Sequence, residues 1–326
     1  MNLKKIFKDF ESRKVLIIGD IMIDSYMWGE IKRQSPEAPV PIVNITKKEN
    51  RLGGAGNVAL NIKSLGATPI LCSVIGKDKY GEELIKLMKK EKLEIDSILI
   101  DNNRKTTVKT RIINNQEHVL RVDEENIQPI KKEKELIKKI ELFINHVDVV
   151  ILQDYNKGVL TKKVIKYILK RANILNIPTI VDPKKENFQE YKKCTLFKPN
   201  LLETMQGMNI NINPKNIQSI KKAASKLRSL IKSKDVLITL SENGICLDSK
   251  EVFLHIPAYK RNIIDISGAG DTVISVAALC KSINIKNEIL CVLSNLAGGL
   301  VCEYAGVVRI NKEILLKEAE NILVNE

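Results

Sequence analysis

Short apolar runs that end in polar residues alternate with longer amphipathic segments along this chain. Five runs have the length of buried strands, at residues 15–20, 69–76, 147–155, 177–183 and 235–244. The segments between them are amphipathic and of helical length, around 79–92, 132–145, 161–175 and 215–231. This alternation predicts a doubly wound α/β fold, with a mostly parallel central sheet flanked by helices. Ligands are then expected at the carboxyl ends of the strands.

Two segments depart from this alternation. Residues 34–46 contain the strand-like run PVPIVNIT after a proline-rich turn, with no obvious crossover helix behind it. Residues 106–125 look like two strands around Asn114 and Asn115, which favour a hairpin turn. Together the two segments predict a small antiparallel β lid, inserted in a single domain that spans residues 1–326. Such a sheet can close over a ligand, form a dimer surface, or do both.

Composition narrows the class of protein. With 44% hydrophobic but only 4% aromatic residues, the 326-residue chain must fill its core with aliphatic side chains, which suits buried parallel strands. The charged start MNLKKIFKDF does not resemble an export signal, and no apolar run reaches the roughly eighteen residues of a membrane span. The six cysteines lack metal-ligand spacing, which is typical of structural thiols in a cytoplasmic protein.

The net charge of +14 raises the question of a polyanionic partner. The lysines, however, are scattered through segments such as IKKEKELIKKIEL, where they alternate with glutamates on a predicted solvated helix face. No recognised nucleic-acid motif accompanies them. We therefore expect no nucleic-acid partner, and the positive surplus is available to steer anionic substrates inward.

The strongest candidate for chemistry is the segment DISGAGDTVISVAALC at 265–280. Gly268, Ala269 and Gly270 predict a turn with little side-chain obstruction that opens into an apolar helix. Backbone N–H groups at such a helix start hold phosphate or developing negative charge. Asp271 lies beside them, where its carboxylate can accept a proton from a hydroxyl as a general base. The alternative is that Asp271 only caps the helix.

A second glycine-rich segment, GGAGNVALNIKSLGA at 53–67, also opens a predicted helix. Gly53 and Gly54 would let backbone amides approach a bound sugar, and Asn57 offers both a donor and an acceptor to hydroxyls. The segment is not the GxGxxG of dinucleotide-binding proteins, and the chain has no GxxxxGK[ST] phosphate loop. Any phosphoryl transfer here must therefore use another architecture.

The pair formed by GGAGN and DISGAGDT resembles the two signatures of the PfkB, or ribokinase-like, carbohydrate kinases, over nearly the whole chain. The resemblance implies an ATP-dependent sugar kinase that uses Mg²⁺, with Asp271 as catalytic base. GDIMIDSY at 19–26 is similar to the family's first strand, which implies that Asp24 binds sugar hydroxyls. Gly56 stands where Ala is commoner, and Ser267 replaces the usual Thr while keeping its hydroxyl.

The nucleotide side of the predicted site also follows from the resemblance. KPNLLE resembles the family's Asn-x-x-Glu motif, which implies that Asn200 and Glu203 organise Mg²⁺, water and nucleotide phosphates. ITLSENGICL and SNLAGGLVC resemble a nucleotide-binding strand and a late helix near the base, and they add Thr239, Glu242, Gly244 and Asn295. Lys184, after a strand end, either contacts ATP phosphates or is one more surface lysine. A requirement for a monovalent cation stays open.

Within the family, QSPEAPVPIV, VKTRIINNQEHVLRVDEE and QDYNKGVL are most similar to kinases of D-glycero-β-D-manno-heptose 7-phosphate. The implied reaction is phosphorylation of the anomeric hydroxyl, in lipopolysaccharide precursor synthesis. Such kinases continue into a nucleotidyltransferase domain that this sequence lacks, so we expect a stand-alone kinase, or one whose partner domain is encoded separately. Lys109, Arg111 and Arg121 on the predicted lid are candidate ligands of the substrate's phosphate, or else solvated charges.

Two other interpretations remain open. One is a PfkB kinase of another sugar, such as ribose, fructose or a related sugar phosphate. The other is a sugar- or nucleotide-binding regulator that has lost catalysis, although its expected signature is a missing base or a broken glycine turn, and both are intact here. We further expect a homodimer that forms through the lid, because a projecting apolar sheet needs cover.

Overall fold

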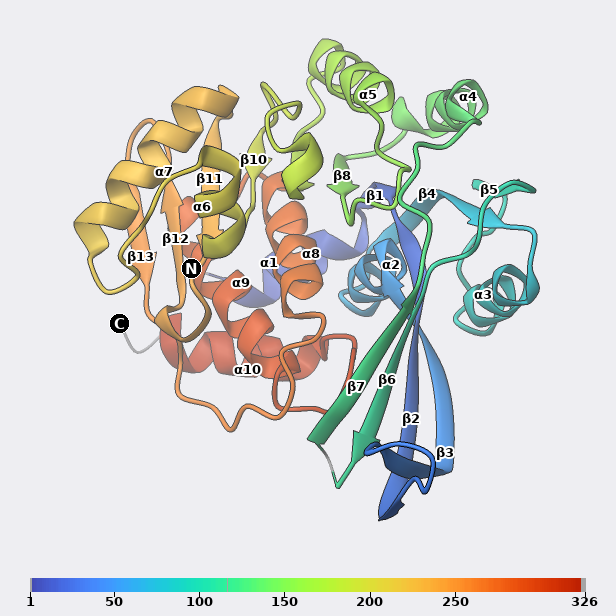
Figure 1. The fold of residues 1–326 in the computed structure, drawn as a ribbon. Helices are drawn as coiled ribbons and strands as arrows, with labels where there is room; N and C mark the ends of the chain where they lie inside the picture. Colours follow the sequence, from blue (N-terminus) through green and yellow to red (C-terminus); the bar gives the residue numbers. More distant parts are fainter. Residues whose placement is uncertain (1, 116, 324–326) are drawn as a thin grey trace.

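The computed structural model describes residues 2–115 and 117–323, which contain a nine-stranded central sheet in the order β13-β12-β11-β10-β9-β8-β1-β4-β5 (Figure 1). Its strands are β1 (Lys14–Gly19), β4 (Thr68–Gly76), β5 (Ile98–Asp101), β8 (Val149–Gln153), β9 (Thr179–Asp182), β10 (Leu196–Phe197), β11 (Asp235–Thr239), β12 (Ile245–Asp248) and β13 (Phe253–Ile256). All neighbours from β5 to β11 are parallel, whereas β12 and β13 are added antiparallel at one edge. The mostly parallel sheet predicted from the alternation of runs is confirmed.

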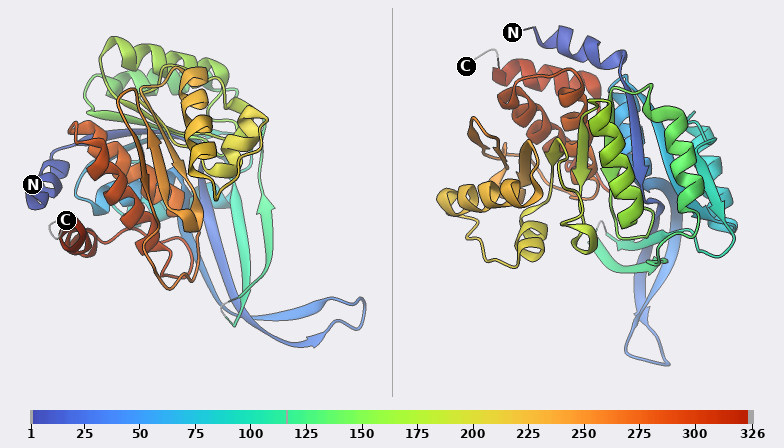
Figure 2. Two further views of the ribbon diagram at one scale, coloured as in Figure 1. Left: turned by 90° about the vertical axis from the view of Figure 1, so that its left-hand side faces the viewer. Right: turned by 90° about the horizontal axis from the view of Figure 1, so that it is seen from above.

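Helices cover both faces of this sheet (Figure 2). One layer contains α1 (Leu3–Glu11), α2 (Ala55–Ser64), α3 (Lys79–Lys90), α8 (Ala269–Ser282), α9 (Asn287–Val301) and α10 (Lys312–Leu323). The other contains α4 (Glu133–Ile144), α5 (Lys162–Ile174), α6 (Leu201–Met208) and α7 (Ile217–Ile231). Alternate residues of β1 pack into opposite layers, Ile17 into the first and Leu16 into the second, because successive strand side chains point to opposite faces. No helix within the described ranges is long and apolar enough to cross a membrane.

A second sheet of four strands, in the order β3-β2-β6-β7, projects from the central domain (Figure 1). Its strands are β2 (Ile21–Gln34), β3 (Pro41–Gly54), β6 (Val108–Asn114) and β7 (Glu117–Glu124). The expected hairpin within residues 106–125 is present as β6 and β7. The small sheet is nevertheless mixed rather than purely antiparallel, because β2 and β6 run parallel. We call these four strands the lid sheet.

The lid sheet is larger than the sequence indicated. The expected segment 34–46 spans the far end of β2, a turn and only the first part of β3. In addition, the motif at 19–26 is shared between the two sheets, since β1 ends at Gly19 and β2 begins at Ile21. Between them the backbone of Asp20 bonds to Gln153 and Ala55, which turns the chain out of the central sheet. Local hydrophobic pattern cannot show this change of partners.

Candidate active site

The segment at 265–280 forms the start of α8, a helix that is buried along most of its length. Gly268 is the N-cap residue, with a φ of 82° that favours glycine. A Cβ on Gly268 would lie 2.9 Å from Nδ2 of Asn57, so the turn and α2 approach closely. Of the three predicted anion-hole amides, that of Ala269 donates to the carbonyl of Ile266 at 3.3 Å. Gly270 faces two charged groups, Lys198 Nζ and Asp182 Oδ2, at 3.7 and 3.8 Å from an added Cβ.

Asp271 lies in the first turn of α8 and is almost fully buried, with 2% of its surface exposed. Its Oδ2 accepts a hydrogen bond from Asn57 Nδ2 at 2.9 Å. Its Oδ1 accepts two, from Gln153 Nε2 at 3.0 Å and from the Tyr155 hydroxyl at 2.8 Å. Burial raises the pKa of Asp271 to about 6, against the lowering effect of the bonds from Asn57 and Tyr155. A carboxyl with such a pKa is ionised at neutral pH and is still basic enough to take a proton.

The predicted sugar-side residues gather where β2 and β3 leave the central domain. Asp24 on β2 forms an ion pair with Arg111 on β6. Gly53 on β3 lies opposite Met22 on β2. It has no room for a side chain, since a Cβ would lie 2.0 Å from Asp24 Oδ2. Gly54 has a φ of 56° and precedes α2, whose third residue is Asn57. The structure thus brings Asp24, Gly53, Gly54 and Asn57 together beside Asp271.

The three lid cations have different surroundings. Lys109 lies with its Nζ 4.7 Å from the ring centre of Tyr155, and burial lowers its pKa. Among the described residues it has no ion-pair partner within 4.0 Å. Arg111 is held by Asp24, whereas Arg121, its register partner on β7, has a largely exposed side chain that bonds to Asp123 at 3.0 Å. Lys109 is therefore the cation with charge left to offer a ligand.

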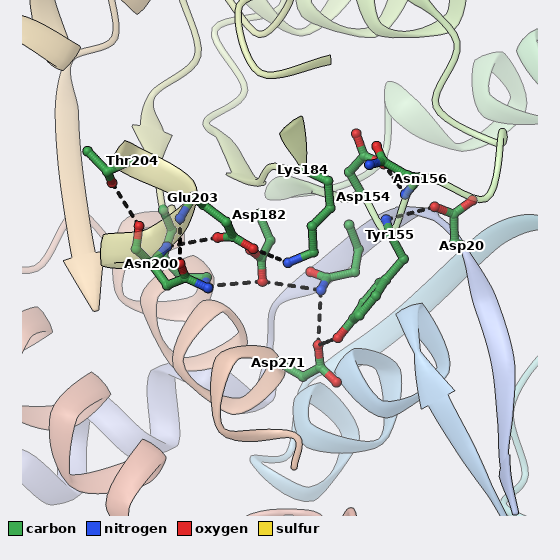
Figure 3. Close-up of polar contacts among 12 residues, drawn as sticks. Asp20, Asp154, Tyr155, Asn156, Asp182, Lys184, Asn200, Glu203, Thr204 and Asp271 are labelled. Carbon is green, nitrogen blue, oxygen red and sulfur yellow. Dashed lines mark hydrogen bonds and ion pairs between the residues drawn. The ribbon is translucent and has the colours of Figure 1, made fainter. Parts of the chain in front are cut away.

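The predicted metal- and phosphate-side residues lie at the start of α6 (Figure 3). Asn200 caps this helix by accepting from the Glu203 amide at 2.7 Å, and Glu203 accepts from the Asn200 amide at 2.8 Å. The second oxygen of Glu203 pairs with Lys184, whose side chain is 29% exposed, so this lysine lies beside the predicted phosphate-side residues. Asn200 also forms a parallel bridge with Thr239 at the end of β11, next to α6.

The remaining nucleotide candidates lie further along the same side. Gly244 ends the turn after β11 with a φ of 85°, where a Cβ would meet the backbone oxygen of Ile256 at 2.0 Å. Asn295 on α9 donates to the carbonyl of Pro257 at 2.7 Å. Glu242, in the same turn as Gly244, is exposed. These contacts hold the backbone of the segment between β13 and α8, which forms one edge of the predicted site.

Four site residues were missed by the sequence analysis. Gln153 and Tyr155 flank the end of β8, Asp182 ends β9, and Lys198 follows β10, so all four occupy the carboxyl ends of parallel strands. Lys198 Nζ lies 3.1 Å from Asp182 Oδ2, and both side chains are nearly inaccessible. Gln153 Nε2 links Asp182, at 3.3 Å, to Asp271. The signal available in the sequence was their position after apolar runs, in QDY, VDP and KPN.

A magnesium ion fits this donor set only through water. The described residues contain no group of three or more His, Cys, Asp or Glu side chains placed to hold a metal. Both oxygens of Glu203 already have partners, and the side-chain oxygen of Asn200 caps α6. Mg²⁺ commonly keeps several waters and binds through one or two carboxylates and substrate phosphates. Glu203 and Asn200 are the residues that would hold it in this way.

Comparison with known proteins defines the class. Residues 12–313 match the pfkB family carbohydrate kinases, so the chain belongs to this family and is an ATP-dependent sugar kinase. It is 40% identical over 306 residues to the bifunctional protein HldE of Campylobacter jejuni strain RM1221. The matched region covers 94% of this chain and 64% of that protein. The chain thus spans less than two thirds of the length of this curated relative.

Solved structures show the same fold at low sequence identity. Phosphofructokinase-2 from Escherichia coli, in complex with potassium, superimposes with a TM-score of 0.78 at 19% identity and covers 96% of this chain and 99% of that one. Arabidopsis thaliana ribokinase, complexed with ribose and ATP, gives a TM-score of 0.73 at 15% identity, with coverage of 95% and 99%. The ribokinase-like fold predicted from the two glycine-rich segments is confirmed.

Proposed function

We propose that this chain transfers the γ-phosphoryl group of ATP to the anomeric hydroxyl of D-glycero-β-D-manno-heptose 7-phosphate, giving the 1,7-bisphosphate for lipopolysaccharide precursor synthesis. The observation that carries the choice of an anionic acceptor is Lys109, a half-buried cation whose pKa is lowered by desolvation and which has no ion-pair partner among the described residues. A buried charge is costly unless a ligand or a partner compensates it. The charges of Asp24 and Asp123 raise the pKa of Lys109, whereas those of Lys157 and Arg111 lower it, so Lys109 lies in a cluster of mixed charge.

Sequence similarity supports the same acceptor. The stretches QSPEAPVPIV and VKTRIINNQEHVLRVDEE resemble the heptose 7-phosphate kinases within the family. The 40% identity to a bifunctional protein HldE agrees with this choice. In the structure the second stretch forms β6 and β7, and therefore carries Lys109, Arg111 and Arg121.

The mechanism proposed for this site is direct in-line transfer. Asp271 takes the proton of the anomeric hydroxyl as the oxygen attacks the γ-phosphorus, and the bond to the ADP oxygen breaks. The turn at 268–270 directs the start of α8 toward the transferring phosphoryl group. Lys198 adds positive charge beside Gly270. Mg²⁺, which Asn200 and Glu203 would hold through water, would neutralise charge on the phosphates. The lid sheet excludes water from the acceptor side, which limits hydrolysis of ATP.

The proposed nucleotide site comprises the residues on the far side of the α8 turn. They are Lys184, Asn200, Glu203, Thr239, Glu242, Gly244 and Asn295. Lys184 reaches both this group and Tyr155, since its Nζ pairs with Glu203 and lies 5.4 Å from the tyrosine ring centre. The potassium bound to E. coli phosphofructokinase-2 makes a monovalent cation a further candidate cofactor, to be tested by varying K⁺ at constant ionic strength.

The test of the proposed function is ATP consumption with heptose 7-phosphate, followed by location of the new phosphate by NMR. A panel of ribose, fructose and their phosphates should give lower kcat/KM. Asp271→Asn should lower turnover by roughly two to four orders of magnitude, as expected for the loss of a general base, while ATP still binds by calorimetry. Asp235→Asn, a buried carboxylate that pairs with Lys281 in the last turn of α8, is the matched control and should remain active. A clear preference for a neutral sugar would refute the heptose assignment alone.

We also propose that the chain forms a homodimer through the outer face of the lid sheet. Exposed apolar side chains gather on its strands, namely Ile31, Ile45, Val119, Leu120 and Val122. Leu120 and Val122 lie two residues apart on β7 and so point to the same face. A second copy of the sheet would cover this surface symmetrically.

A further inference from the structure

The two oxygens of Asp271 are not equivalent in this structure. Oδ1 accepts two hydrogen bonds, from Gln153 Nε2 and from the Tyr155 hydroxyl. Oδ2 accepts one, from Asn57 Nδ2. A carboxylate offers about four lone-pair positions, two on each oxygen. Oδ1 is therefore saturated, and the free lone pair of the base is on Oδ2.

We propose that Tyr155 is a positioning residue for the base: its hydroxyl, together with Gln153, holds Oδ1 of Asp271, so that Oδ2 takes the proton of the acceptor hydroxyl. This inference rests on the proposed role of Asp271. The acceptor O–H bond breaks and the proton moves to Oδ2, while Tyr155 keeps its own proton throughout. Burial and the nearby Asp271 raise the pKa of Tyr155 well above its usual value, in agreement with a hydroxyl that only donates.

A buried carboxylate holds the backbone of Tyr155 in place. Asp20, which is 1% exposed, accepts three backbone hydrogen bonds from the turn after β8. The donors are the amide of Tyr155 at 2.8 Å (Figure 3), and the amides of Lys157 at 3.1 Å and Val159 at 3.1 Å. Three amides around one carboxylate leave this turn little freedom to move. The strand β1 thus sets the position of Tyr155 through Asp20, without touching Asp271.

The ring of Tyr155 lies close to one lysine from each of the two predicted substrate sides. Lys109 Nζ of the lid sheet lies 4.7 Å from the ring centre and Lys184 Nζ lies 5.4 Å from it. A Cβ on Gly54 would lie 3.5 Å from the ring, so the glycine-rich segment packs closely against it. Contact between a cation and the face of an aromatic ring is favourable in a desolvated site. Tyr155 therefore orients the base at the point where the acceptor cation, the phosphate-side lysine and the glycine turn meet.

The first experiment compares pH profiles of kcat/KM for the whole enzyme and for Tyr155→Phe, which keeps the ring and its contacts with both lysines. Because the lost bond favours the ionised carboxylate, the acidic limb should move to higher pH by about one to two units, the equivalent of one charge-assisted hydrogen bond. The KM for ATP should change less than about twofold. The readout is the shift between variants, since a sugar phosphate itself titrates near pH 6.

Tyr167→Phe is the matched control. Tyr167 on α5 also bonds to a carboxylate, Glu141 on α4, in the helical layer away from Asp271. Its removal should leave the profile where it is. A second replacement, 3-fluorotyrosine at position 155, keeps the fold and makes the hydroxyl a stronger donor. It should move the acidic limb to lower pH, opposite to the effect of phenylalanine.

The outcomes distinguish a failure of the role proposed for Tyr155 from a failure of the role proposed for Asp271. If Asp271→Asn retains near-normal turnover, Asp271 is not the base and both ideas are lost. If Asp271→Asn is inactive while the limbs of Tyr155→Phe and the 3-fluorotyrosine enzyme coincide with that of the wild type, only the role of Tyr155 is refuted. A uniform loss of activity in Tyr155→Phe at every pH, without a shift, indicates a merely structural residue and also overturns the proposal.

Discussion

At the scale of single residues, burial and hydrogen bonding around Asp271 determine the pKa of the proposed base and so the pH range in which we expect activity. Burial raises the pKa of this carboxyl to about 6, and only its ionised form accepts a proton. We therefore expect kcat/KM to fall as the pH is lowered through about 6 and to level off above it. The measurement is a steady-state profile from about pH 5 to 9, and a flat profile between pH 5 and 7 would contradict the assignment.

The raised pKa of Asp271 affects the stability of the fold in the opposite direction from activity: stability falls as the pH rises. The folded pKa of Asp271 lies above its ordinary value of 3.8, so the folded state binds this proton more tightly than the unfolded chain does. The stabilising contribution of this group is complete below about pH 3.8 and is lost as the pH rises through about 6. At neutral pH the ionised base therefore lowers the free energy of unfolding, as is common for groups placed for catalysis.

Lys109 provides a second test at this scale. Lys109→Met keeps the length of the side chain but removes its charge, and should raise the KM for a sugar phosphate about tenfold or more. The KM for ATP and the kinetics of a neutral sugar should change little. Lys47→Met is the control, because Lys47 lies on β3 of the same lid sheet, is exposed and pairs with Glu49. Equal KM values for both variants would show that the acceptor's phosphate is held elsewhere.

At the scale of elements, the junction between β3 and α2 places the glycine-rich segment against the site. Gly54 has a φ of 56°, and a Cβ there would lie 2.5 Å from the backbone oxygen of Asp20. Gly56 lies inside α2, and its nearest neighbours would be side chains of Leu52 and Ile21 at 3.1 and 3.2 Å. Steric conflict with backbone cannot relax easily, whereas side chains can move.

We therefore expect Gly54→Ala to lower the free energy of unfolding by more than about 1 kcal/mol, because alanine is strained at positive φ. Gly56→Ala, the control, should cost less, since alanine gains up to about 1 kcal/mol of helix propensity that offsets its tight contacts. Urea denaturation followed by circular dichroism gives both values. A larger loss for Gly56→Ala than for Gly54→Ala would show that the φ of Gly54 does not limit this junction.

At the scale of the whole molecule, the exposed apolar face of the lid sheet predicts self-association. Leu120 and Val122 on β7 are 54% and 45% exposed. The double variant Leu120→Glu with Val122→Glu should convert a dimer into a monomer by sedimentation at micromolar concentration, because charge on a covered apolar face is costly. Leu142→Glu on α4, an even more exposed leucine of the central domain, is the control. A wild type that sediments as a monomer would refute the dimer.

The sequence by itself determined five strands of the central sheet, the helices that follow several of them, the glycine turn before α8 and the place of Asp271 in its first turn. Hydrophobic periodicity and turn chemistry act over a few residues, so a pattern of letters is enough to predict them. The hairpin of β6 and β7 was predictable for the same reason. The continuation of residues 21–34 into the lid sheet was not, because strand partners are chosen by packing and not by local pattern.

Only the tertiary structure decided how the base is surrounded. The donors to Asp271 come from residues 214, 118 and 116 positions away, namely Asn57, Gln153 and Tyr155. Asp24 likewise meets Arg111 across 87 positions. No local propensity links such distant segments. Gln153 and Tyr155 reach Asp271 from the carboxyl end of β8, Asn57 reaches it from α2, and Asp24 meets Arg111 across the lid sheet. The sequence could therefore name Asp271 as the candidate base, whereas only the fold shows that its two oxygens have different hydrogen-bond partners.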